Sequence, residues 1–189
     1  MKGSITLLPI IALVGVALLW YFWPLSGRFE RLTALEVDQE YWDKQSGGAP
    51  WVVMSLPTAA LRDPQHLRRY QYWEEAIREL PGVQQVITLL EDRPGAFTGQ
   101  ASRFLTVPDD PARLDSLLGI FYQTSPHGEW LTNAPQTATF MVVVFQKETT
   151  RVQRQQLLDD VSMVSEQFSE VTGVSLRYGA TNELREIAR

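Results

Sequence analysis

An uncharged run near the N-terminus constrains this chain most strongly. Residues 5–23 contain 19 consecutive positions without a charged side chain. At a rise of about 1.5 Å per residue, a helix of this length crosses a hydrocarbon layer of about 30 Å. The run ends in the aromatic cluster 20–23, followed by Pro24, which is typical of a membrane interface and unlike the small-residue site of a cleaved signal peptide. We therefore predict an uncleaved transmembrane anchor over residues 1–27.

Composition leaves room for one further domain and excludes several functions. The chain has 189 residues, a formal net charge of -5 and no cysteine. Its length suits one domain plus the anchor. The negative charge argues against nucleic acid as a partner, which would need clustered Lys and Arg. The missing cysteines exclude disulfides and Cys-ligated metals. Lys2 on one side of the anchor nearly balances Arg28 and Arg31 on the other, so charge alone does not choose its orientation.

Strand and helix patterns alternate after the anchor. Strands are predicted at 51–56, 83–90, 137–146 and 174–178, from their β-branched and aromatic content. Between the first two, Asp63 and Pro64 predict a helix start. Between the last two, Thr150 and Gln153 form a capping-box pattern, and Gly173 predicts a helix end. The apolar stripes of the two helices are Leu67, Tyr70, Trp73, Ile77 and Leu80, then Leu157, Val161, Val164, Phe168 and Val171.

This order predicts an α+β fold of the ferredoxin-like split βαβ type over residues 28–181. Two helices would lie on one face of a four-stranded antiparallel sheet, giving a two-layer domain. A long insertion, residues 91–136, separates strands two and three. It is expected to hold one short helix, with Asp110 as cap before Pro111 and an apolar stripe of Leu114, Leu117, Leu118 and Phe121. Residues 182–189 resemble the start of another helix, with Asn182 as its N-cap. We expect this helix to lead back toward the membrane.

One predicted strand carries large apolar side chains on both faces. Residues 140–145 are apolar at six consecutive positions. A two-layer domain would leave one of these faces wet, so we expect a cover from residues after 189 or from a partner chain. The alternative is that the 91–136 insertion folds over the sheet. Candidate substrate-cleft or interface residues are Trp42 and Trp130, which lie in irregular segments, together with Phe140, Val142 and Val144.

The search for catalytic motifs gives no positive indication. Glycine-rich phosphate loops, nucleophile elbows and helical zinc motifs are all missing from the sequence. The two histidines, His66 and His127, fall in a first helical turn and in a Pro/Gly loop, where a solvated or hydrogen-bonded role is favoured over metal binding. We expect no enzymatic activity, no cofactor and no metal.

Three segments resemble one family of transporters. These are residues 80–88 (LPGVQQVIT), 137–144 (TATFMVVV) and 178–184 (YGATNEL), which follow an N-terminal membrane helix in that order. Together they resemble the start of a resistance-nodulation-division (RND) superfamily transporter, with the MMPL-like exporters as the most similar branch. The resemblance covers nearly the whole chain.

The resemblance implies a topology and a role. The first membrane helix would have a cytoplasmic N-terminus in a bacterial inner membrane and lead into the first porter subdomain on the periplasmic side. That subdomain would pack on neighbouring subdomains of the same transporter, or on a partner subunit, around a path for a lipid-like or hydrophobic substrate. Residues 5–23 contain no ionisable side chain to relay protons, so this part alone would not pump. The alternative is a stand-alone, single-pass binding or scaffold module tethered to the membrane lipids.

Overall fold

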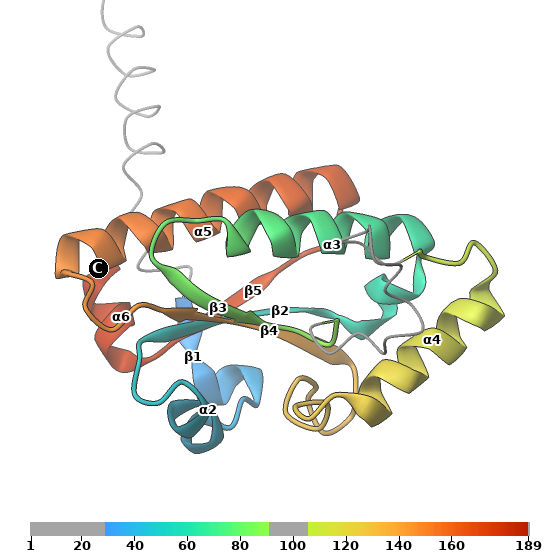
Figure 1. Ribbon diagram of the computed structural model, residues 1–189, viewed down its shortest axis with the longest axis horizontal. Helices are drawn as coiled ribbons and strands as arrows, with labels where there is room; N and C mark the ends of the chain where they lie inside the picture. The colour runs from blue at the N-terminus through green and yellow to red at the C-terminus, as the bar shows by residue number, and fades with distance from the viewer. Residues whose placement is uncertain (1–28, 91–105, 189) are drawn as a thin grey trace, which may run out of the picture.

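The computed structural model describes residues 29–90 and 106–188 (Figure 1). The predicted anchor, residues 1–27, lies outside them, as does part of the predicted insertion. Among the residues described, no helix is long and apolar enough to span a membrane. The strands are β1 (Phe29–Arg31), β2 (Trp51–Pro57), β3 (Val83–Ile87), β4 (Ala138–Phe145) and β5 (Arg177–Ala180). The helices are α2 (Gln39–Gln45), α3 (Pro64–Arg78), α4 (Pro111–Thr124), α5 (Arg151–Thr172) and α6 (Asn182–Ile187), with 3-10 turns η2 (Leu32–Leu35) and η3 (Thr58–Arg62).

The fold is α+β, with a five-stranded mixed sheet in the order β1-β5-β2-β4-β3. The four predicted strands pair antiparallel throughout. The prediction of a four-stranded sheet is wrong because β1 pairs in parallel with β5, Phe29 lying opposite Tyr178 and Arg31 opposite Ala180. This three-residue strand lies in a polar segment without an apolar alternation, and its hydrogen-bonding partner is at the far end of the chain.

Helices α3 and α5 cover one face of the sheet, as predicted (Figure 1). Ser165 on α5 donates a hydrogen bond from Oγ to Sδ of Met54 on β2 at 3.1 Å. Met54 pairs with Met141 on β4, so the two methionines lie on the same face. Leu67, Tyr70, Trp73 and Ile77 of the predicted α3 stripe are buried. The α5 stripe is buried at Leu157, Val161 and Phe168, whereas Val171 near its end is exposed.

Local capping patterns fix where these helices begin. Thr150 and Gln153 form the predicted capping box, and Gly173 ends α5 in the left-handed region at a φ of 71°. Asp110 accepts a hydrogen bond from the Ala112 N–H at the start of α4. The prediction for α6 is wrong in one detail, because Thr181 holds the N-cap position and Asn182 is the first helical residue.

The N-cap of α3 gives a prediction about stability. Asp63 Oδ1 accepts hydrogen bonds from the backbone N–H of Gln65 at 2.7 Å and of His66 at 3.1 Å. These two hydrogen bonds hold the pKa of Asp63 below its usual value, and the bond from His66 has the larger effect. We expect Asp63→Ala to lower the free energy of unfolding by about 1 kcal/mol, and Asp63→Asn, which keeps an acceptor oxygen, to lower it less. Urea unfolding of residues 28–189 at pH 7 measures both.

The lowered pKa also fixes the sign of the pH dependence. A carboxylate with a depressed pKa stabilises the fold fully above its unfolded pKa, about 3.9, and loses that contribution as pH falls through the folded value. The difference in free energy of unfolding between the unchanged protein and Asp63→Ala should therefore shrink as the pH is lowered below about 5. A difference that grew on acidification would contradict the cap as its source.

The second face of the sheet is covered by the chain itself, so the two-layer prediction is wrong. Figure 1 shows α2, α4 and the segment after α4 on the side of the sheet opposite α3 and α5. A Cβ built on Gly179 of β5 would lie 2.6 Å from Cδ1 of Leu35 in η2, so η2 packs directly against this face. Trp51 Nε1 on β2 donates to Oδ1 of Asp43 on α2 at 2.8 Å. The cover therefore includes residues 32–45, which the sequence pattern did not identify.

Candidate functional site

Three of the predicted site residues lie beneath this cover. Phe140, Val142 and Val144 have exposed fractions of 1%, 1% and 2%. Val142 pairs with Val53, which pairs in turn with Gly179, and this register places Val142 on the face that η2 covers. The strand is thus part of the core and needs no cover from outside the chain. In the residues described, these three side chains are not open to a substrate or a partner.

The structure brings Trp42 and Trp130 into one aromatic cluster with Tyr41 and His127. Tyr41 stacks on Trp130 with ring centroids 4.2 Å apart and meets Trp42 edge-on at 5.0 Å. The Tyr41 hydroxyl lies 2.7 Å from Nδ1 of His127. Burial raises the pKa of Tyr41 above its ordinary value. The His127 ring centroid lies 5.7 Å from that of Trp42.

This cluster connects α2 to the segment that follows α4. Trp42 is fully buried and Trp130 is half-buried. Sequence reasoning identified the two tryptophans but missed Tyr41, the residue that brings them together, because an aromatic residue beside another in a polar segment carries no indication of its distant partner. The hydrogen-bonded role favoured for His127 is confirmed. The cluster connects α2 to the segment after α4 through ring contacts and one hydrogen bond.

An apolar groove lies instead between α3 and α5, with a volume of about 240 Å³. Trp73 and Phe168 stack at its base with centroids 4.6 Å apart, and Trp73 Nε1 donates to Ser165 Oγ at 3.1 Å. Tyr72 and Val171 at its edges are 59% and 61% exposed. The lining residues are Arg69, Tyr72, Trp73, Ala76, Val164, Gln167, Phe168 and Val171. The groove can contact an apolar molecule or an apolar surface.

The two ends of the described domain lie together. Strands β1 and β5 run side by side in parallel, and Arg185 Nε on α6 donates to the carbonyl oxygen of Phe29 at 3.3 Å. The first residue described and the last helix are therefore in direct contact. The start and the end of the described domain therefore lie at the same edge of the sheet.

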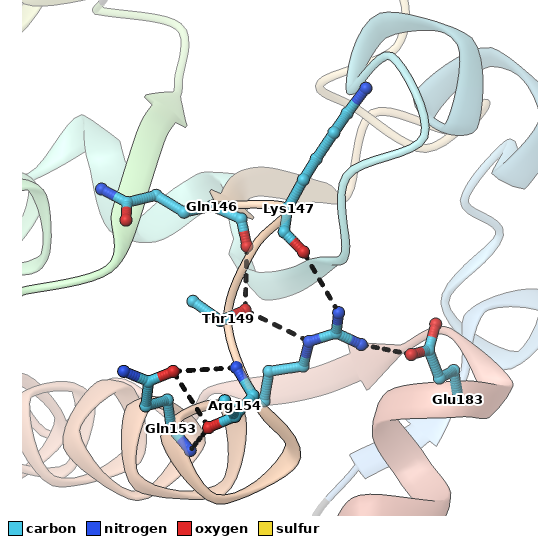
Figure 2. A network of polar contacts seen from close by, with 7 residues as sticks. Gln146, Lys147, Thr149, Gln153, Arg154 and Glu183 are labelled. Carbon is cyan, nitrogen blue, oxygen red and sulfur yellow. Dashed lines mark hydrogen bonds and ion pairs between the residues drawn. The ribbon is translucent and has the colours of Figure 1, made fainter.

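Arg154 fixes α6 against the start of α5. Figure 2 shows its guanidinium between Thr149, Lys147 and Glu183. Nε donates to Thr149 Oγ1 at 3.2 Å, Nη2 donates to the Lys147 carbonyl at 3.4 Å, and Nη1 forms an ion pair with Glu183 of α6. Leu184, the next residue of α6, is fully buried. These contacts set the direction in which the chain leaves the sheet.

We expect Arg154→Met to lower the free energy of unfolding by about 1–2 kcal/mol and to speed amide hydrogen exchange in α6, because three acceptors lose their donor at once. Glu183→Gln is the matched control, since it removes only an ion pair whose carboxylate is exposed, for which a loss under about 1 kcal/mol is normal. Hydrogen exchange of residues 28–189 measures the effect of each variant on α6 and on global unfolding. A larger effect of Glu183→Gln would show that the ion pair, and not the whole network, holds α6.

Within the described parts of the chain, no group of three or more His, Asp or Glu side chains is placed to hold a metal ion. His66 and His127 lie on separate elements, at the start of α3 and after α4. No protein-family model matches the sequence, and a search of curated proteins finds no match.

Proposed function

We propose that this chain is the N-terminal, membrane-anchored part of a proton-driven exporter similar to the RND superfamily, with the MMPL-like exporters as its branch. Residues 1–27 would anchor it in a bacterial inner membrane with the N-terminus cytoplasmic, and the described domain would be its first periplasmic porter subdomain. The observation that carries the proposal is the contact between the domain's two ends. A domain placed between two membrane helices needs its chain to enter and leave on the same side.

The sheet order supports the same proposal. Omitting β1, the strands lie in the order β5-β2-β4-β3, with α3 and α5 on one face. Numbered along the chain, this is four-one-three-two, the order of the ferredoxin-like split βαβ arrangement that the pattern of strands and helices in the sequence predicts. Strand β1 adds a fifth, parallel strand immediately after the proposed anchor. It would align the anchor with the edge of the sheet from which the chain later leaves.

The α3–α5 groove is the part of this domain that we assign to the hydrophobic-substrate path. The core residues Phe140, Val142 and Val144 are buried, whereas Tyr72 and Val171 expose large apolar groups beside the Trp73–Phe168 stack. A lipophilic ligand needs apolar walls with few polar anchors, and here Arg69 and Gln167 are the polar residues lining the groove.

An accumulation assay in the source bacterium tests this function. The lipophilic dye Nile red would be measured in cells with the gene intact, deleted, or carrying Tyr72→Asp at its own chromosomal position. We expect deletion and Tyr72→Asp to raise dye accumulation several-fold, because a carboxylate in the groove opposes binding of apolar molecules. The matched control is Val152→Asp on α5, an exposed residue outside the groove, which should behave as the intact gene. Unchanged accumulation on deletion would contradict an export role for this dye class.

The second candidate is a self-sufficient binding or scaffold module tethered to the membrane. One observation favours it: all residues of β4 from Phe140 to Phe145 are buried by the chain's own segments. With both faces of the sheet covered, we expect residues 28–189 to be a monodisperse monomer, which a self-sufficient module requires and a porter subdomain also permits. Solubility therefore does not separate the two candidates, and the size of the native protein does.

A further inference from the structure

A polar cleft lies where β1, η2 and α6 meet, beside the two ends of the domain. Its volume is about 490 Å³. Two arginines and one glutamate line it, together with neutral polar side chains; these residues are Arg31, Thr33, Gln39, Asn182, Arg185 and Glu186. The groove between α3 and α5 differs from this cleft because its lining is mainly apolar.

The charges in this cleft suit a single negative group. Two guanidinium groups and one carboxylate leave one net positive charge. In the described residues, neither Arg31 nor Arg185 forms an ion pair with a carboxylate. Arg185 uses Nε–H for the Phe29 carbonyl, and a guanidinium has five N–H donors in all, so further donors remain on its terminal nitrogens. Arginine guanidinium groups bind phosphate oxygens through paired, charge-assisted hydrogen bonds.

The position of the cleft points to the source of that phosphate. Phe29, which contacts Arg185, is six residues beyond Trp23, the last residue of the uncharged run. An extended chain spans at most about 3.6 Å per residue, so Phe29 lies within roughly 22 Å of the end of that run. If the run spans the bilayer, as the proposed function requires, this distance allows the cleft to reach the headgroup layer, which adds about 5–8 Å on each side of the hydrocarbon core.

We propose that this cleft binds the phosphate of a membrane phospholipid headgroup, with Arg31 and Arg185 as its cationic ligands. The hydroxyl of Thr33 and the amide of Asn182 supply neutral donors on the same walls. Binding there would hold the domain at a fixed height and orientation on the membrane surface. The inference rests on the membrane anchor of the proposed function, and it concerns a lipid of the surrounding bilayer and not the exported molecule.

Native mass spectrometry of the full chain, released from maltoside micelles, tests the proposal. The probes are dihexanoyl-phosphatidylglycerol, inorganic phosphate and dihexanoylglycerol, which has the acyl chains without the phosphate. We expect one tightly retained dihexanoyl-phosphatidylglycerol, at least tenfold weaker retention of the other two, and at least tenfold weaker lipid binding in R31Q/R185Q. The matched control R62Q/R113Q replaces two exposed arginines outside the cleft and should bind as the unchanged protein.

Each other outcome overturns the proposal in a distinct way. Equal binding of inorganic phosphate would assign the cleft to a free anion, and equal loss in R62Q/R113Q would reduce the binding to general charge attraction. R31K/R185K guards against misfolding: it keeps both charges but loses the paired hydrogen bonds of the guanidinium groups, so it should bind the lipid more weakly than the unchanged protein and more tightly than R31Q/R185Q. Binding no tighter than that of R31Q/R185Q, together with normal thermal unfolding, would exclude charge as the basis. The anchor is tested separately by alkaline extraction of cell membranes. Release of the chain there contradicts the proposed function whatever the micelle experiment shows.

Discussion

Replacing Phe140 by alanine is expected to lower the free energy of unfolding of residues 28–189 by about 3–5 kcal/mol, the usual cost of removing a buried aromatic ring. Phe140 is 1% exposed, and its backbone N–H donates to the Leu131 carbonyl at 2.8 Å. The ring therefore lies in a closed core, where the cavity left behind cannot be filled by water without further cost. Urea unfolding measures the change.

Two valines give a matched pair for the same test. Val142 on β4 is 1% exposed and Val152 on α5 is 79% exposed. We expect Val142→Ala to cost about 2 kcal/mol and Val152→Ala to stay within about 0.5 kcal/mol of the unchanged protein. A small effect of both Phe140→Ala and Val142→Ala would mean that the strand is open in solution, as a sheet awaiting an external partner would be.

Gly179→Ala is expected to lower the free energy of unfolding by about 2 kcal/mol, because it overpacks the second face. The added Cβ would lie 2.6 Å from Cδ1 of Leu35, 2.9 Å from Cγ1 of Val53 and 3.0 Å from Cδ2 of Leu32. Val53 is β-branched and held in the central strand β2, so it has little freedom to move. Either η2 or β5 must shift outward.

The control for this change is the same substitution in an open position. Gly119 lies in helix α4, and a Cβ there would meet nothing within 4 Å. Gly119→Ala should raise the free energy of unfolding by about 0.5–1 kcal/mol, since alanine is the better helix former. Opposite signs for the two substitutions would establish that η2 packs on the sheet. A stabilising Gly179→Ala would contradict that packing.

Features of this fold that depend on neighbouring residues could be predicted from the sequence. A capping interaction joins residues two or three apart, so the local sequence at Asp63, Asp110 and Thr150 is enough to predict a helix start. Apolar stripes at helical spacing likewise identified Leu67, Tyr70, Trp73 and Ile77 as core residues. The strands that carry β-branched runs, β2 and β4, were predicted nearly to their bounds.

Features that depend on distant pairing could not be predicted in the same way. Strand β1 is three residues long and has its partner in β5, so no local periodicity marks it. Helix α2 buries Trp42 alone among its residues, too few for an amphipathic pattern. The continuous apolar run of β4 was interpreted as a face awaiting a partner, with the 91–136 insertion as the alternative cover. In the structure η2 and α2 supply the cover together with α4 and the segment after it, which belong to that insertion.

The candidate site shows the same division. Trp42 and Trp130 were identified by residue type. The contact between them could not be predicted, because it depends on Tyr41, which stacks on Trp130 and lies against His127, 86 positions further along the chain. The α3–α5 groove was missed because Trp73 satisfies the core pattern and also forms the base of the groove. Pattern analysis assigns such a side chain to one role only.

The size of the native protein tests the central claim most directly. An antibody raised against residues 28–189 would be used to blot membranes of the source organism, with a strain lacking the gene as control. If this domain is the first porter subdomain of an exporter, the band should be several-fold heavier than the 21.5 kDa of this chain and should remain in the membrane after alkaline extraction. A band near 21.5 kDa would contradict the exporter and identify a single-pass module.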